Sequence, residues 1–298
     1  MTATRPVETV AESSAQPEAG RKFGPLLPDR MRRRGRPHLL VELVFTVGLY
    51  LAYSRTRRYV PSHRTAAMHR AREILHTERL LHIDLELTLN HAVDKVSWLV
   101  VSMNYYYASL HFLVTPLVLI WLYTFRPAQY RAGRTALYTA TLLALFGFAF
   151  FALAPPRFLS DQGFIDTVVE HHTWGSIGSE AVSTVSNQYA AMPSVHIVWA
   201  AWSGITVAFL ARHTWIRVLG ALYPVATFVV ILSTGNHFIA DAAGGALTLA
   251  LGFLIQRVLS GKPAYRAPGD RWSKPPVALS GPVLRPEAGP RTEAGPGA

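Results

Sequence analysis

Two short strings of the sequence hold residue types that could carry out nucleophilic and acid–base chemistry. Residues 192–196 read Met-Pro-Ser-Val-His and residues 235–241 read Gly-Asn-His-Phe-Ile-Ala-Asp, each where a long apolar run begins. Their histidines, His196 and His237, are forty-one residues apart, which is the length of two membrane crossings of about 20 residues each. A chain that crosses a membrane twice returns to the face it left. We therefore expect both histidines and Asp241 at one membrane boundary, where ionisable residues are usually functional.

These residues could form a nucleophile with its supporting groups. His237 and Asp241 are four positions apart and share one face of a helix, so the carboxylate can accept a ring N–H and fix the imidazole tautomer. His196 could donate a proton, and the planar guanidinium of Arg157 could hold two phosphate oxygens. Ser194 lies at a helix start, where unpaired backbone N–H groups attract anions.

We expect this chemistry to need no metal ion and no other cofactor. The carboxylates near the site are too few for a magnesium cage. The chain has no cysteine, which excludes disulfides, thiolate metal sites and a cysteine nucleophile.

The composition is typical of a membrane protein with several spans. Of the 298 residues, 50% are hydrophobic and only 16% are charged, and the mean hydropathy is +0.20. The apolar residues are clustered rather than spread, as in polytopic membrane proteins. The formal net charge of +11 lies in tails and short loops, where we expect contact with lipid headgroups and no binding of nucleic acid.

The apolar runs predict an all-α fold, a polytopic membrane helical bundle of about six transmembrane helices. The expected spans are 39–53, 104–125, 135–154, 193–211, 214–233 and 239–257. The first is short and is interrupted by Glu42. In 54–95 apolar residues alternate with charged ones, which predicts an amphipathic helix on the membrane surface.

Three regions divide the chain. Residues 1–37 and 260–298 are rich in proline and polar residues, which predicts disordered cytoplasmic tails at both ends. Residues 38–259 form the expected membrane-embedded domain, which contains both histidine strings.

The distribution of arginine predicts the orientation of this multi-pass protein in the cell membrane. The connections 126–134 and 212–217 carry arginine and no acid, whereas the loop 158–190 carries acids and no lysine or arginine. The positive-inside rule puts both connections and both termini in the cytoplasm and the two histidine strings outside. The segment 54–95 is an exception, since it is basic but must lie outside.

The same residues resemble the signature of the type 2 phosphatidic acid phosphatase superfamily of membrane enzymes. That signature reads Lys-x6-Arg-Pro, then Pro-Ser-Gly-His, then Ser-Arg-x5-His-x3-Asp. Residues 193–196 match the second part, His237 and Asp241 match the end of the third, and Arg157 in Ala-Pro-Pro-Arg stands for the first. The resemblance covers roughly residues 100–257.

The resemblance implies a role for each matching residue. His237 would be the nucleophile that forms a phosphohistidine, His196 would protonate the leaving alcohol, and Arg157 would hold the phosphate. The expected substrate is a membrane lipid phosphate or phosphodiester, handled at the extracytoplasmic face. Water as acceptor would make the chain a hydrolase, and an alcohol acceptor would make it a transferase. The sequence does not choose between them.

Three departures from the signature favour one branch of the superfamily. Phe150 stands where the family has lysine, Ile231 stands where the third motif has arginine, and Val195 replaces glycine. The branch that includes the inositol phosphorylceramide synthases, which are inositolphosphotransferases, relaxes these positions, and the chain is most similar to it. Asn236 and Gln188 could supply replacement hydrogen bonds to the phosphate.

Two classes of protein other than an enzyme could also use these histidines. A non-enzymatic membrane transporter or channel could use interfacial histidines in a proton path, but such residues would be expected midway across the membrane. A bis-histidine haem protein would need facing histidines deeper in the bilayer. The oligomeric state is not predicted.

The outer end of the second span carries a further polar and aromatic group. Residues 104–107 read Asn-Tyr-Tyr-Tyr, which we interpret as an aromatic belt at the membrane boundary, with a headgroup site as the alternative. His111 lies one turn deeper, where an interhelical hydrogen bond is expected and a position facing the site is the alternative.

Overall fold

The computed structural model describes residues 25–27, 37–59, 64–173, 189 and 191–265. Within these residues it contains α-helices and short 3₁₀-helices but no β-strand. Most of both predicted tails lies outside the described residues, as does the predicted phosphate-binding residue Gln188. The compact unit that contains the helices extends through Tyr265, whose hydroxyl lies 2.7 Å from Thr206 Oγ1.

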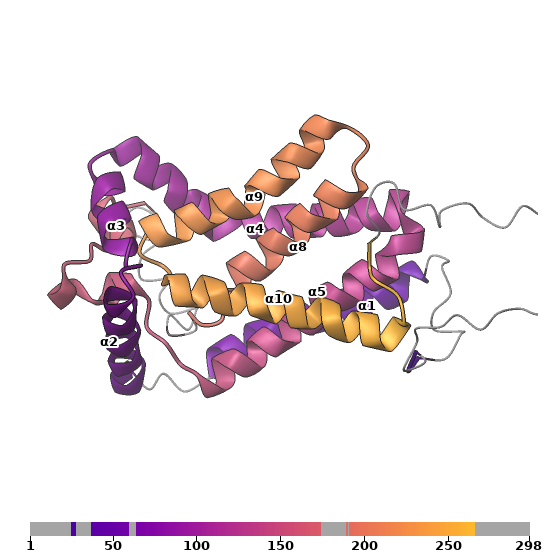
Figure 1. The fold of residues 1–298 in the computed structure, drawn as a ribbon, viewed down its shortest axis with the longest axis horizontal. Helices are drawn as coiled ribbons and strands as arrows, with labels where there is room; N and C mark the ends of the chain where they lie inside the picture. Colours follow the sequence, from indigo (N-terminus) through magenta and orange to yellow (C-terminus); the bar gives the residue numbers. More distant parts are fainter. Residues whose placement is uncertain (1–24, 28–36, 60–63, 174–188, 190, 266–298) are drawn as a thin grey trace, which may run out of the picture. The chain divides into compact units, whose positions relative to one another are not determined.

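Six apolar helices run side by side and form the bundle (Figure 1). They are α1 (Leu39–Tyr59), α4 (Ser97–Phe125), α5 (Pro127–Phe150), α8 (Val195–Leu210), α9 (Thr214–Ser233) and α10 (Ile239–Ser260). By length and composition α4, α5, α9 and α10 can cross a membrane, while α8 and the segment Leu39–Ala52 of α1 are shorter apolar helices. The predicted all-α membrane helical bundle is confirmed.

The predicted loop over 126–134 is wrong, because nearly all of it is helical. α4 ends at Phe125 and α5 begins at Pro127. Proline suits a first helical position, where its missing N–H would have no partner. α9 begins at Thr214, where the span over 214–233 is predicted to begin, so it includes part of the predicted connection 212–217.

The third predicted span also ends earlier than expected. α5 stops at Phe150 instead of reaching residue 154. The chain beyond it is extended, with Leu153 N donating to Tyr189 O at 2.7 Å and Ala154 N to Ala67 O at 3.3 Å. The backbone N–H groups that would have continued the helix are therefore bonded to other segments, and two prolines follow.

Arginines at the end of the bundle where α4 meets α5 bind buried acceptors. Arg126 Nη2 donates to Leu210 O at 2.8 Å and Arg217 Nε to Ala208 O at 2.7 Å, so both satisfy carbonyls at the C-terminus of α8. Arg134 forms an ion pair with Glu42, the carboxylate that interrupts the first apolar run. This pair attaches α1 to α5.

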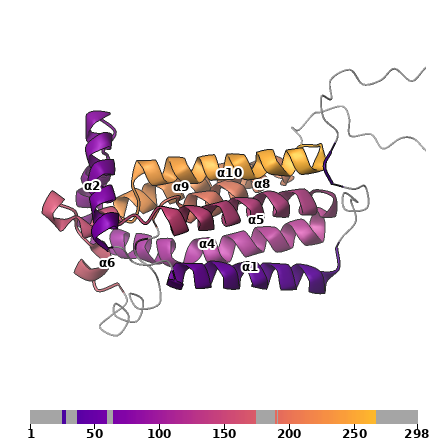
Figure 2. The same cartoon turned by 90° about the horizontal axis from the view of Figure 1, so that it is seen from below.

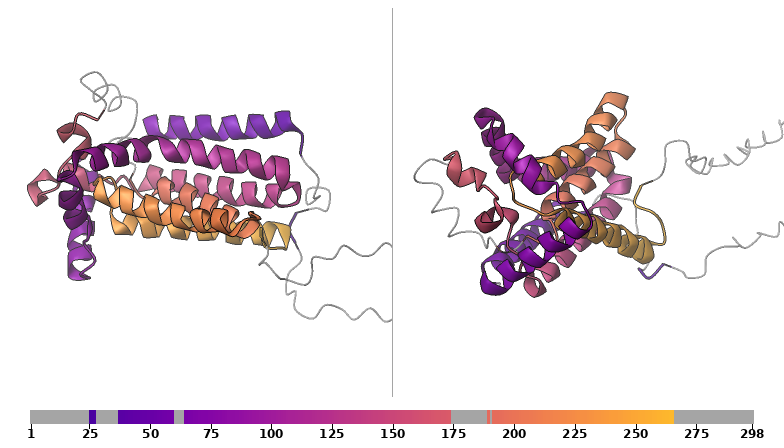
Figure 3. Two further views of the ribbon diagram at one scale, coloured as in Figure 1. Left: turned by 90° about the horizontal axis from the view of Figure 1, so that it is seen from above. Right: turned by 60° about the vertical axis from the view of Figure 1, so that its left-hand side comes forward.

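The predicted single surface helix over 54–95 is two helices, α2 (Arg64–Leu80) and α3 (Glu86–Asp94). His82, between them, has a positive φ of 57°. α2 lies across the end of the bundle, crosswise to the spans (Figure 2). The views in Figure 3 show α2 and α3 at the same end of the bundle.

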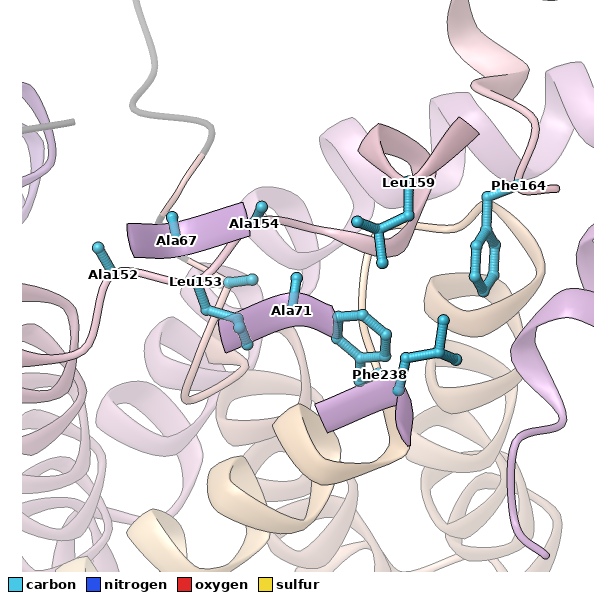
Figure 4. Packing of buried hydrophobic residues seen from close by; sticks show 10 residues of the cluster. Ala67, Ala71, Ala152, Leu153, Ala154, Leu159, Phe164 and Phe238 are labelled. Carbon is cyan, nitrogen blue, oxygen red and sulfur yellow. The ribbon is translucent and has the colours of Figure 1, made fainter. Parts of the chain in front are cut away.

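Small and aliphatic side chains attach α2 to the bundle (Figure 4). Ala67, Ala71 and Leu75 are buried against Leu153 and Phe238. Its arginines bond to the loop after α5, since Arg70 Nη1 donates to Ala152 O at 2.9 Å and Arg72 pairs with Asp161 at 3.3 Å. These contacts explain how the basic segment 54–95 lies at the same end of the bundle as the acidic loop that follows α5.

The loop after α5 packs on the same end. It contains the 3₁₀-helices η2 (Pro156–Phe158) and η3 (Ser160–Gln162) and the short helix α6 (Thr167–Glu170). Asn104 of α4 fixes α6, because its Nδ2 donates to Thr167 O at 3.1 Å and to Thr173 Oγ1 at 2.8 Å.

Candidate active site

A tight turn between α9 and α10 holds His237. The backbone N–H groups of Asn236 and His237 both donate to Ile231 O, at 3.0 and 3.1 Å. Gly235 in this turn has a positive φ of 63°, and a Cβ there would lie 3.2 Å from Arg157 Cβ. The turn therefore needs glycine both for its left-handed backbone and for the close approach of the neighbouring chain.

The same turn fixes the backbone of Arg157. Arg157 N donates to Gly235 O at 2.9 Å. Its guanidinium lies over the Phe158 ring, 5.0 Å from the centroid, and its Nε is 3.4 Å from Asp166 Oδ2. Asp166 thus neutralises part of the charge that Arg157 could offer to a phosphate.

Asp241 orients the imidazole of His237. Its Oδ2 lies 3.2 Å from His237 Nδ1 and also accepts the backbone N–H of Phe238 at 3.0 Å. Both residues are buried, with His237 3% exposed and Asp241 fully buried. An N–H on Nδ1 directed at the carboxylate leaves the lone pair of the ring on Nε2.

His196 lies directly opposite that lone pair. Its Nδ1 is 3.3 Å from His237 Nε2. The two helix starts are joined through the backbone, since Ser194 N donates to Asp241 O at 3.0 Å. Gly245 permits this approach, because a Cβ there would lie 2.5 Å from Ser194 O. The structure thus brings His196, His237 and Asp241 into one connected group.

Two aromatic residues of α4 enclose His196. The Tyr107 ring stacks on it at 4.2 Å between centroids, and the His111 ring meets it edge-on at 4.3 Å. The alternative position for His111, facing the site, is therefore the one observed. Tyr107 and His111 are one helical turn apart, a spacing that could have indicated a shared face in the sequence.

The aromatic belt expected over 104–107 describes only part of that segment. Asn104 is buried, Tyr106 Oη lies 2.9 Å from Thr227 Oγ1, and Tyr107 packs on His196. Tyr105 is exposed, although its hydroxyl donates to Thr173 O at 2.7 Å. The belt prediction is wrong for the three residues that face the protein.

The remaining predicted phosphate ligands have partners of their own. Ser194 Oγ accepts the Ile197 N–H at 3.5 Å as the N-cap of α8, and Ser194 is fully buried. Asn236 Nδ2 donates to Thr234 Oγ1 at 2.7 Å, while its Oδ1 has no partner among the described residues. Phosphate binding by Ser194 and Asn236 stays a prediction, and Gln188 lies outside the described residues.

Sequence reasoning missed two carboxylates that reach the start of α10. Glu78 of α2 and Glu86 of α3 are 2% exposed and fully buried, respectively. Burial raises the pKa of the Glu78 carboxyl to about 8, and the neighbouring Glu86 adds to that rise. Neither residue belongs to a recognisable motif. Across the described part of the chain, no group of three or more histidine and acidic side chains is placed to hold a metal ion.

The family model for the PAP2 superfamily matches residues 72–255. The chain belongs to the PAP2 superfamily. The match begins within α2 and ends within α10. It therefore includes Glu78, Glu86 and the histidine group, which consists of His196, His237 and Asp241. No curated protein and no solved structure matches the chain. Together with its apolar helices, this membership makes the chain a membrane protein of the phosphatase type.

Proposed function

We propose that the chain transfers a phosphoryl group from a membrane lipid phosphate or phosphodiester, without a metal ion, through a phosphohistidine on His237. The observation that carries this proposal is the placement of the two ring nitrogens of His237. Nδ1 faces Asp241 Oδ2 at 3.2 Å and Nε2 faces His196 Nδ1 at 3.3 Å. One nitrogen has an orienting carboxylate and the other has a proton donor within reach.

The reaction would take place in two balanced steps. Nε2 of His237 attacks phosphorus and forms the N–P bond, while the P–O bond to the lipid breaks and His196 protonates the departing oxygen. Asp241 stabilises the positive charge that develops on the attacking ring. Water or an alcohol then attacks phosphorus, His196 accepts its proton, and the N–P bond breaks.

The donor phosphate can reach His237 only after His196 has turned aside. A separation of 3.3 Å between the two ring nitrogens leaves no space for a phosphate group between them. The ring of His196 is also bounded by Tyr107 and His111, at 4.2 and 4.3 Å. Donor binding therefore replaces the contact between the histidines with contacts to phosphate.

The small number of cations supports a phosphodiester donor and hence the inositolphosphotransferase-like branch. The positions of the family lysine and arginine hold Phe150, which is exposed, and Ile231, which is buried. Arg157 is the predicted guanidinium clamp, and it is shared with Asp166. A phosphodiester carries a single negative charge, whereas a phosphomonoester carries about 1.5 to 2 at neutral pH. One shared guanidinium suits the smaller charge better.

We place the histidine group at the extracytoplasmic face, with both termini in the cytoplasm. The arginines that cap α8, and Arg134, lie at the other end of the bundle, which supports this orientation under the positive-inside rule. Single cysteines can test it, since the chain has none. A cysteine at Ser160 should react with an impermeant maleimide on intact cells, and one at His213 only after lysis. The reverse pattern would place the site on the cytoplasmic side.

Activity against a panel of lipids tests the function itself. Purified protein would be offered lipid phosphomonoesters and phosphodiesters, with and without an alcohol acceptor such as inositol or a ceramide, in excess EDTA. We expect turnover by the wild type and by the His213→Ala control, whose histidine is exposed. We expect none by His237→Ala. Loss of turnover on chelation, or full turnover by His237→Ala, would contradict the mechanism.

A further inference from the structure

The first turn of α10 is bonded to three carboxylates from three different helices. The backbone N–H groups of Phe238, Ile239 and Ala240 donate to Asp241 Oδ2 at 3.0 Å, Glu86 Oε1 at 2.7 Å and Glu78 Oε1 at 2.8 Å. Asp241 belongs to α10, Glu86 to α3 and Glu78 to α2. A helix normally fills these positions with one capping side chain and water.

Two of these three acceptors, Glu78 and Glu86, come from outside α10. Phe238 is fully buried in the cluster that attaches α2 to the bundle (Figure 4). Ile239 and Ala240 beside it are partly buried, and an N–H group shielded from water without a partner costs free energy. Both N–H groups donate to buried carboxylates on α3 and α2.

We propose that Glu78 and Glu86 are positioning residues, which hold the first turn of α10 so that Asp241 stays bonded to His237. The inference rests on the proposed function, because it assigns these residues to the same site. Asp241 Oδ2 already accepts both the His237 ring and the Phe238 N–H. If Glu78 or Glu86 is lost, Asp241 is the acceptor left beside the orphaned N–H groups. A shift of its carboxylate toward them would release Nδ1 of His237.

Glu78 keeps its proton at neutral pH, because its pKa is raised to about 8, and this makes three buried carboxyl groups compatible. Glu78 faces Glu86 on α3 and Asp241 on α10, and Asp84 adds negative charge beside Glu86 while pairing with Arg79 at 3.8 Å. His237 lies beyond Asp241. Because burial and these charges raise the pKa of Glu78 to about 8, the folded protein holds a proton that the unfolded chain releases near pH 4.5. Stability contributed by that proton is lost as the pH rises through about 8.

Three variants test the positioning role against a matched control. Glu78→Ala and Glu86→Ala remove the acceptors, whereas Glu78→Gln keeps an acceptor oxygen and resembles the protonated carboxyl. Glu73→Ala removes an exposed glutamate from the same helix, α2, and is the control. Thermal unfolding in detergent would show which variants fold.

We expect the two alanine variants to lower kcat by about 10²-fold with little change in KM, since small displacements of catalytic groups have effects of this size. The activity of the wild type should fall above pH 8, where Glu78 loses its proton. Glu78→Gln should keep wild-type kcat at pH 7 and should not show that fall. Wild-type kcat in the folded alanine variants would overturn the proposal. Equal losses in Glu78→Gln and Glu78→Ala would overturn it as well.

A second measurement works without turnover, so it separates this inference from the proposed function. Diethyl pyrocarbonate modifies histidine rings, and peptide mass spectrometry reports the rate at His237. Glu78→Ala and Glu86→Ala should make His237 react several-fold faster, while Glu78→Gln and Glu73→Ala should react like the wild type. Equal rates in all five proteins would overturn the positioning role even if no substrate is ever turned over. Absence of turnover together with the expected rates would count against the proposed function alone.

Discussion

Buried carboxylates have different bonding partners at the two ends of the bundle. At the arginine-rich end, Glu42 pairs with Arg134 and accepts the Tyr130 hydroxyl at 2.9 Å. At the other end, Glu78 and Glu86 accept hydrogen bonds from backbone N–H groups. Among the described residues, no lysine, arginine or histidine lies within ion-pair distance of either carboxylate. A carboxylate with a permanent cation is a fixed structural pair. Carboxylates that accept backbone N–H groups can instead position the helix start beside a neighbouring histidine, as we propose for Glu78 and Glu86.

The largest expected difference between the ends concerns His237 and Asp241. His237→Ala should abolish turnover, and Asp241→Asn should lower kcat by about 10⁴-fold, because an amide favours the wrong tautomer of the imidazole. Steady-state kinetics with the best lipid donor would measure both. Wild-type kcat in the Asp241→Asn protein would mean that this carboxylate does not support His237, and the two ends would then not differ in the role of their carboxylates.

The next effect separates the two histidines. Loss of a general acid typically costs about 10² to 10⁴-fold, and the loss is greatest when the leaving group is poor. His196→Ala should therefore lose activity on an alkyl phosphate but retain much of it on an aryl phosphate, and His237→Ala should be inactive on both. The ratio of rates on the two substrates is the measurement. An equal loss on both in His196→Ala would assign His196 to phosphate binding instead.

A smaller effect is expected at the ring that stacks on His196. Tyr107→Ala removes a stacked aromatic contact, and such contacts are worth about 0.5–1.5 kcal/mol, so kcat should fall by up to about tenfold. Tyr107→Phe keeps the ring and should match the wild type. Parallel kinetics of the two variants would decide. A loss in Tyr107→Phe equal to that in Tyr107→Ala would mean that the hydroxyl, rather than the stacking, supports catalysis.

The smallest effect on catalysis is expected at the arginine-rich end. Arg134→Ala leaves Glu42 buried without its cation, which should cost about 3–5 kcal/mol of stability. The kcat of the protein that remains folded should be unchanged, because the pair lies at the opposite end from His237. Thermal unfolding and active-site titration would measure the two quantities. A fall in kcat per folded molecule would show that the ends are coupled.

The sequence predicted the helices best where apolar composition alone sets the limits. The span expected over 214–233 coincides with α9 at both ends. The start expected at residue 135 for the third span is wrong, because α5 begins at Pro127 and includes the arginines of this segment. Within helices the long arginine side chains reach acceptors at the bundle end, as Arg126 does at Leu210 O.

The candidate site was predictable to the extent that its residues form local motifs. The spacing of His237 and Asp241 and the helix start at His196 indicated the group that the structure brings together. Glu78, Glu86 and Tyr107 carry no such spacing relative to these residues. They meet the site only through the packing of α2, α3 and α4, which a single sequence does not specify.

The pair formed by Glu42 and Arg134 also has a consequence for synthesis of the chain. The two residues are 92 positions apart, so at about 5–20 residues per second the ribosome makes Arg134 about 5–20 seconds after Glu42. During that interval the carboxylate in the first turn of α1 lacks its cation, and charged side chains are disfavoured in the membrane, most strongly at a helix centre. The ion pair that joins α1 to α5 forms only when α5 arrives, so chains that stop after α4 should hold α1 in the bilayer less firmly.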